Sequence, residues 1–136
     1  MSIPRVLVVD DHPDTLQLFD TYLSFAGFAV TATNSAAHAI EIASGPFDAV
    51  TTDLAMPGMD GHELIRRLHT LHAAHPIPIV VVSGQVLPVM PAGPEGVNCC
   101  RLFKKPCELE ALADTLHALI ETCPHDCRRC LHPAGA

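Results

Sequence analysis

The amino-acid sequence predicts an α/β fold with a doubly wound, five-stranded parallel sheet. Five short apolar runs alternate along the chain with segments in which apolar residues repeat at helical spacing. These runs lack the polar alternation of half-exposed strands, which is typical of parallel strands buried on both faces. The chain has 136 residues, of which 49% are hydrophobic. A single domain of this size can bury a core without disulfides or a bound metal.

The expected strands lie at residues 5–9, 28–33, 49–52, 77–82 and 102–104. The first expected helix begins near Pro13, where a missing amide hydrogen costs nothing, and ends at Gly27. Ser35 is a candidate N-cap for a second helix, which stops before Gly45 and Pro46. Leucine and isoleucine at helical spacing mark a third helix between 64 and 71, and a last amphipathic helix over 109–120.

One segment interrupts the alternation of strands and helices. A fourth helix is due between the fourth and fifth strands, but that interval contains Pro88, Pro91, Gly93, Pro94 and Gly96. Proline removes a helical hydrogen bond and clashes with the preceding turn, at about 3 kcal/mol or more for each residue. We therefore expect the fourth helix to be degenerate.

We expect one domain over residues 2–121 and a separate tail over residues 122–136. The formal net charge of −7 disfavours a nucleic-acid partner, because binding a phosphate backbone requires a basic face. The apolar runs are far shorter than the about 20 residues of a membrane span. Asp10 and Asp11 also interrupt the first run before it could act as a secretion signal. These features predict a cytoplasmic protein whose cysteines are thiols or metal ligands.

Chemically active side chains follow four of the expected strands. Asp10 and Asp11 come after the first strand and Asp53 after the third, whereas Ser83 follows the fourth and Lys105 the fifth. The carboxyl ends of parallel strands meet at one edge of a sheet, where such folds bind ligands. Crowded carboxylates repel one another, and Mg²⁺ relieves this repulsion while keeping room for phosphate oxygens. This edge is therefore expected to bind Mg²⁺ and a phosphoryl group.

These motifs resemble the receiver domain of response regulators, a CheY-like family with flavodoxin-like topology. The resemblance covers about residues 2–121. It rests on Val-Leu-Val-Val-Asp-Asp at 6–11, Thr-Asp-Leu-Ala-Met-Pro-Gly-Met-Asp-Gly at 52–61, Val-Val-Ser-Gly at 81–84 and Lys105-Pro106. The separations of 30 residues from Asp53 to Ser83 and 52 from Asp53 to Lys105 also match the family pattern.

The resemblance implies a role for each residue of the edge. Asp53 is expected to be the phosphoacceptor, taking the phosphoryl group from a phosphohistidine of a sensor histidine kinase or a histidine phosphotransfer protein. Ser83 and Lys105 are expected to contact phosphoryl oxygens. The implied Mg²⁺ ligands are Asp10, Asp11, Asp53 and the backbone carbonyl of Ala55.

Two features bear on how the signal leaves the domain. Leu102 stands three positions before Lys105, where the family usually carries an aromatic residue that swings inward. The Pro/Gly-rich segment 86–96 also displaces most of the helix at the usual output surface, so we expect a monomer or a weak dimer.

Lys104 competes with Lys105 as the lysine that contacts the phosphoryl group. Neighbouring side chains of a strand face opposite ways, so only one of the two can point at the site. The position before proline favours Lys105.

The tail contains a cluster of possible metal ligands. Cys-x-x-Cys is a common half of a tetrahedral zinc site. A Zn²⁺ site, a redox role and an ordinary tail therefore stay open as alternatives. His12, beside the acidic residues, is expected only to line their pocket. The tail ligands that could hold Zn²⁺ are Cys123, Cys127, Cys130 and His132.

The sequence thus predicts a stand-alone phosphorelay receiver with a downstream protein target. It would signal by protein contact or onward phosphotransfer and would not be a conventional enzyme, because it assists only its own phosphorylation and dephosphorylation. A phosphorylation-independent interaction module on the same fold is the main alternative. A phosphohydrolase with an aspartate nucleophile is disfavoured, because Ala55 stands where an Asp-x-Asp arrangement needs its second carboxylate.

Overall fold

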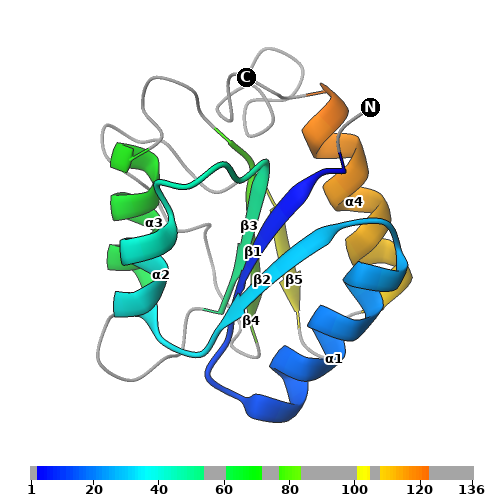
Figure 1. Ribbon diagram of the computed structural model, residues 1–136, viewed down its shortest axis with the longest axis horizontal. Helices are drawn as coiled ribbons and strands as arrows, with labels where there is room; N and C mark the ends of the chain where they lie inside the picture. Colours follow the sequence, from blue (N-terminus) through cyan, green and yellow to red (C-terminus); the bar gives the residue numbers. More distant parts are fainter. Residues whose placement is uncertain (1–2, 54–60, 72–76, 84–100, 105–107, 123–136) are drawn as a thin grey trace.

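A parallel sheet with helices on both faces forms the body of the molecule (Figure 1). The computed structural model describes residues 3–53, 61–71, 77–83, 101–104 and 108–122. In chain order its elements are β1 (Arg5–Val9), α1 (Pro13–Phe25), β2 (Ala29–Thr33), α2 (Ala36–Ile42), β3 (Ala49–Thr52), α3 (Gly61–Leu71), β4 (Ile79–Ser83), β5 (Arg101–Lys104) and α4 (Leu109–Thr122).

The strand order is β2-β1-β3-β4-β5, and every neighbouring pair is parallel. This is the order of the flavodoxin-like doubly wound sheet, in which ligands bind where the order reverses at β1 and β3. Helices α1 and α4 cover one face of the sheet, and α2 and α3 cover the other (Figure 1). The predicted fold class is confirmed.

Two apolar clusters, one on each face, explain why the strand runs lack polar alternation. Val6 and Val8 of β1 pack with α1 and α4, whereas Leu7 and Val9 pack with α2 and α3. All four are at most 1% exposed. Successive side chains of a strand point to opposite faces, so a strand covered on both sides, as β1 is, favours apolar residues on both faces.

The helix boundaries follow the predicted signals. Pro13 occupies the first turn of α1, and Gly27 after that helix has φ 105°, a conformation that L side chains rarely adopt. The Ser35 hydroxyl accepts a hydrogen bond from the His38 amide at 3.2 Å, which caps α2.

The fourth strand differs from its predicted bounds. It begins at Ile79 instead of 77, because Pro78 has no amide hydrogen to give to the ladder. The Pro78 carbonyl still accepts a hydrogen bond from the Val50 amide at 3.0 Å. Ser83 is the last residue of β4 and stands in register with Lys104, instead of following the strand.

Other predictions fall on parts of the chain outside the described residues. They include the degenerate fourth helix within 84–100 and every feature of the tail from 123 onward. None of the described helices is long and apolar enough to span a membrane.

His117 of α4 ties this helix to the end of α1, a contact that the sequence pattern does not indicate. Its Nε2 lies 3.2 Å from the carbonyl oxygen of Ala26, which follows the last turn of α1. Its ring also stacks on Phe28, with centroids 4.2 Å apart. One side chain thus joins α4 to the end of α1 and to Phe28, the residue before β2.

The core on the α1 and α4 face predicts a sharp contrast between two leucines of the same helix. Leu23 is fully buried, whereas Leu18 is 53% exposed. We expect Leu23→Ala to lower the free energy of unfolding by about 2–5 kcal/mol, because it leaves a cavity in a packed core. Leu18→Ala is the matched control with a much smaller effect, and urea denaturation followed by circular dichroism measures both. Equal losses in the two variants would contradict the described packing of α1.

Candidate functional site

The carboxyl ends of β1 and β3 bring Asp10 and Asp53 together. Val9 and Thr52 are partners in the ladder between these strands, and each is followed directly by one of the two aspartates. The Asp53 amide donates a hydrogen bond to the Val9 carbonyl at 3.1 Å, and the Asp10 amide donates to the Thr33 carbonyl of β2 at 3.2 Å. The backbone thus fixes both aspartates at the edge where ligands bind in this kind of sheet.

Both aspartates are buried, which is unusual for ionisable residues. Asp10 is 2% exposed and Asp53 is 5% exposed. Oδ1 of Asp10 accepts a hydrogen bond from the His12 amide at 2.9 Å. Buried carboxylates persist in proteins when hydrogen bonds or cations compensate for lost hydration. Two of them side by side therefore indicate a binding site rather than a structural element.

Asp11 adds a third carboxylate with an unsatisfied atom. Its side chain is 26% exposed, but its Oδ1 is buried and has no hydrogen-bond partner. A buried oxygen left in this state costs about 1–3 kcal/mol, and more when it is charged. A cation at the edge would remove this penalty.

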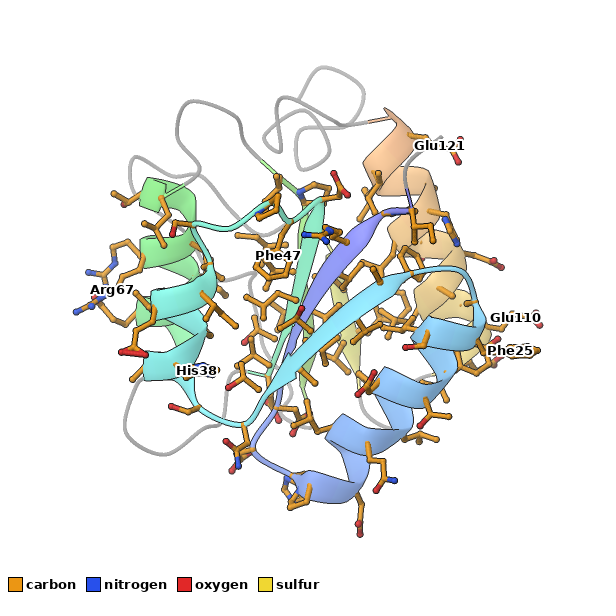
Figure 2. The ribbon with its side chains drawn as sticks, viewed as in Figure 1. Phe25, His38, Phe47, Arg67, Glu110 and Glu121 are labelled. Atoms are coloured by element: carbon orange, nitrogen blue, oxygen red, sulfur yellow. The ribbon has the colours of Figure 1, made fainter. Side chains whose placement is uncertain are left out.

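Three arginines of the described part of the chain lie away from the carboxylates at the strand ends. Arg5 is at the opposite end of β1 from the aspartates. Arg66 and Arg67 both pair with Glu63 on α3, at 2.7 and 2.8 Å, and Figure 2 shows Arg67 projecting away from the sheet. These three arginines therefore do not offset the negative charge of the edge.

A compact set of ligand atoms meets the requirements of a divalent cation. Within the described part of the chain, Asp10, Asp11 and His12 each offer one ligand atom, and these atoms lie within 4.8 Å of one another. Carboxylate oxygens are the ligands that Mg²⁺ prefers. The donor atoms and the unsatisfied Asp11 oxygen thus fit a bound dication. The sequence predicts Asp10 and Asp11 as metal ligands, but it predicts only that His12 lines the pocket.

The remaining predicted site residues are placed in part or lie outside the described residues. Ser83 ends β4, which is the neighbour of β3 in the sheet. Ala55 and Lys105 are not among the described residues. The same holds for the tail, for which a Zn²⁺ site was one of three alternatives, and that alternative has no support. The candidate ligands of that alternative are Cys123, Cys127, Cys130 and His132.

The family follows from a comparison with known protein families. Residues 6–117 match the model of the response regulator receiver domain. The chain belongs to the response regulator receiver family. Receiver domains are signalling modules of two-component systems and are not a classical enzyme family, and the acidic pocket of such domains binds Mg²⁺. The pocket of this receiver contains Asp10 and Asp11.

Relatives of this receiver include sensor proteins. The chain is 33% identical over 115 residues to the sensory/regulatory protein RpfC of Xanthomonas campestris pv. campestris. This alignment covers 82% of this chain and 16% of RpfC. The chain is 40% identical over 88 residues to the sensor histidine kinase GacS of Pseudomonas protegens, covering 62% of this chain and 10% of GacS. The receiver thus spans only a small part of the length of these relatives.

Solved structures agree with the fold. A sensor protein from Polaromonas sp. JS666 is 32% identical with a TM-score of 0.77, covering 88% of this chain and 98% of that one. A CheY-like receiver domain from Methanospirillum hungatei JF-1 also has a TM-score of 0.77, covering 88% of this chain and 95% of that one. At 21% identity, this second likeness bears on the fold alone.

The unsatisfied oxygen of Asp11 predicts opposite effects of one substitution with and without metal. In metal-free buffer, we expect Asp11→Asn to raise the free energy of unfolding by about 1 kcal/mol, because it removes a charge from crowded carboxylates. Added Mg²⁺ is expected to stabilise the parent through binding to the native state, but not the variant. Thermal denaturation with EDTA or with Mg²⁺ measures both effects.

Asp114→Asn on the exposed side of α4 is the matched control. It is expected to leave the Mg²⁺-dependent stabilisation intact. Equal stabilisation of the parent and Asp11→Asn by Mg²⁺ would exclude Asp11 as a ligand.

Proposed function

We propose that this receiver accepts a phosphoryl group on Asp53 from a phosphohistidine, with Mg²⁺ bound, and passes on the signal by protein contact or onward phosphotransfer. The observation that carries the proposal is the burial of the Asp53 carboxylate beside Asp10 at the switch point of the sheet. The family match supports the phosphorelay role. The sensor relatives support a sensor histidine kinase or a phosphotransfer protein as the donor.

In the proposed reaction, one carboxylate oxygen of Asp53 attacks the phosphorus of the donor. The new O–P bond forms as the N–P bond of the phosphohistidine breaks, and the released imidazole takes up a proton. When bound, Mg²⁺ offsets the negative charge of the phosphoryl oxygens and of the carboxylates around them. The burial of Asp53 limits the access of water, which favours attack by the carboxylate. The proposed Mg²⁺ ligands are Asp10, Asp11, Asp53 and the carbonyl of Ala55.

The sheet order supports roles for Ser83 and Lys105 in binding the phosphoryl group. Strand β4 neighbours β3, and β5 neighbours β4, so all three strands end at the edge that contains Asp53. In the proposed site, the Ser83 hydroxyl donates a hydrogen bond to one phosphoryl oxygen, and the Lys105 ammonium forms an ion pair with another. Lys104 is the last residue of β5. Because neighbouring side chains of a strand face opposite ways, only one of Lys104 and Lys105 is expected to face the phosphoryl group, and we propose Lys105.

Phosphoryl uptake from a small donor tests the proposal directly. We expect the full chain to gain the mass of one phosphoryl group after incubation with acetyl phosphate and Mg²⁺, measured by intact-protein mass spectrometry. Asp53→Asn is expected to gain none, because the amide is not a nucleophile. Asp48→Asn is the matched control at the other end of β3, where Asp48 accepts a hydrogen bond from the Arg5 amide. It is expected to gain one phosphoryl group.

Two further variants separate the lysines in the same assay. Lys105→Gln is expected to lower the phosphorylated fraction, whereas Lys104→Gln leaves it unchanged. A folded parent that gains no phosphoryl group would overturn the proposal. It would also favour the phosphorylation-independent interaction module.

A further inference from the structure

His12 lies beside the acidic pocket, and its ring makes no capping hydrogen bond to helix α1, which it precedes. Its amide donates to Oδ1 of Asp10 at 2.9 Å, and its carbonyl accepts from the Leu16 amide at 2.9 Å. The residue is the N-cap of α1, but its side chain makes no capping hydrogen bond. The backbone is therefore fixed next to the pocket, while the imidazole stays 72% exposed and available to a ligand.

The spacing of the donor atoms fits a shared cation better than a direct hydrogen bond. Nδ1 of His12 lies 3.6 Å from Oδ1 of Asp11, which is too long for an N–H···O hydrogen bond. Two ligand atoms that each lie about 2.1 Å from one cation are separated by about 3.0 to 4.2 Å. The 3.6 Å spacing falls within this range.

The burial of the same Asp11 oxygen also favours a cation. It is buried and has no hydrogen-bond partner, although a histidine ring that could donate a proton is its neighbour. The ligand atoms of Asp10, Asp11 and His12 also lie mutually within 4.8 Å. A single ion can therefore contact two oxygens and one nitrogen with small side-chain movements.

We propose that His12 is a nitrogen ligand of the pocket cation, so that this receiver binds a first-row transition-metal dication in preference to Mg²⁺. The inference rests on the cation pocket of the proposed function. Imidazole nitrogen is a good ligand for this class of metals, whereas Mg²⁺ favours carboxylate, carbonyl and water oxygens. The carboxylates of Asp10 and Asp11 serve either ion. Only a transition metal gains a further strong bond from His12.

Mn²⁺ is the best probe of this ligand set. Soft thiolates select other metals, whereas oxygen ligands suit Mn²⁺, so the cysteines of the tail compete least for it. We would titrate the full chain with Mn²⁺, follow free Mn²⁺ by electron paramagnetic resonance, and obtain the Mg²⁺ affinity by competition. Electron spin-echo modulation of the bound Mn²⁺ reports a directly coordinated imidazole nitrogen.

The test compares the parent with His12→Asn and His69→Asn. Asparagine keeps a good N-cap for α1 and removes the imidazole. We expect His12→Asn to raise the Kd for Mn²⁺ about tenfold or more, since even losing a residue that only orients a ligand costs about 10–100-fold. Its Mg²⁺ affinity stays unchanged and the nitrogen modulation disappears. His69→Asn, the control near the end of α3, is expected to match the parent.

Two results would overturn the inference and separate its failure from that of the proposed function. The first is an equal Mn²⁺ affinity in the parent and His12→Asn, with no nitrogen modulation in the parent. This result would exclude His12 as a ligand of the cation. Mg²⁺-dependent phosphoryl uptake would then still support the proposed function. A folded parent that binds neither Mn²⁺ nor Mg²⁺ would remove the cation pocket and, with it, the metal-dependent part of the proposed function.

Discussion

The parallel pairing of β1 with β3 is the constraint on which the site depends. The Asp53 amide donates to the Val9 carbonyl at 3.1 Å, so the chain segments that follow both strands leave the sheet side by side. Both strands are buried apart from Arg5, and a slip of one residue would exchange the side chains that pack into the two apolar clusters. Because the core cannot tolerate that slip, it also fixes the position of Asp10 next to Asp53.

The site brings several carboxylates together, whereas acidic side chains elsewhere in the described fold lie apart on the surface. Glu110 and Glu121 project outward from α4 (Figure 2), where water screens them. At the strand ends, two carboxylates are nearly buried, and Asp11 has a buried oxygen without a hydrogen bond. Natural folds depart from locally favourable interactions mainly at functional sites. The two apolar clusters of the sheet supply the stability that holds such an arrangement.

Most of the fold could be predicted from the sequence, because burial on both faces leaves a direct mark on a strand. Residues 5–9 and 49–52 are predicted with the observed bounds, since each strand ends directly before an aspartate, Asp10 or Asp53. The start of β4 was wrong by two residues, because the apolar pattern does not register the missing amide of Pro78. Asp10 and Asp53 could be grouped because parallel strands end at one edge.

The histidine contacts could not be predicted, because each depends on distances that a pattern does not contain. His117 contacts Ala26 across 91 positions of sequence, and nothing in the helical period of α4 indicates that pairing. The place of His12 in the pocket depends on the turn between β1 and α1. There its amide bonds to Asp10 while its ring makes no capping hydrogen bond. A motif gives the residues of that turn but not the direction of the ring.

The central claim is that Asp53, with its neighbouring carboxylates and Mg²⁺, forms a pocket for a phosphoryl group. Beryllofluoride mimics that group, so the most direct measurement is an amide nuclear magnetic resonance titration of the full chain with beryllofluoride and Mg²⁺. The account predicts resonance changes centred on Asp10, Asp11 and Asp53 that require both components together. An unchanged spectrum from the folded protein would contradict it.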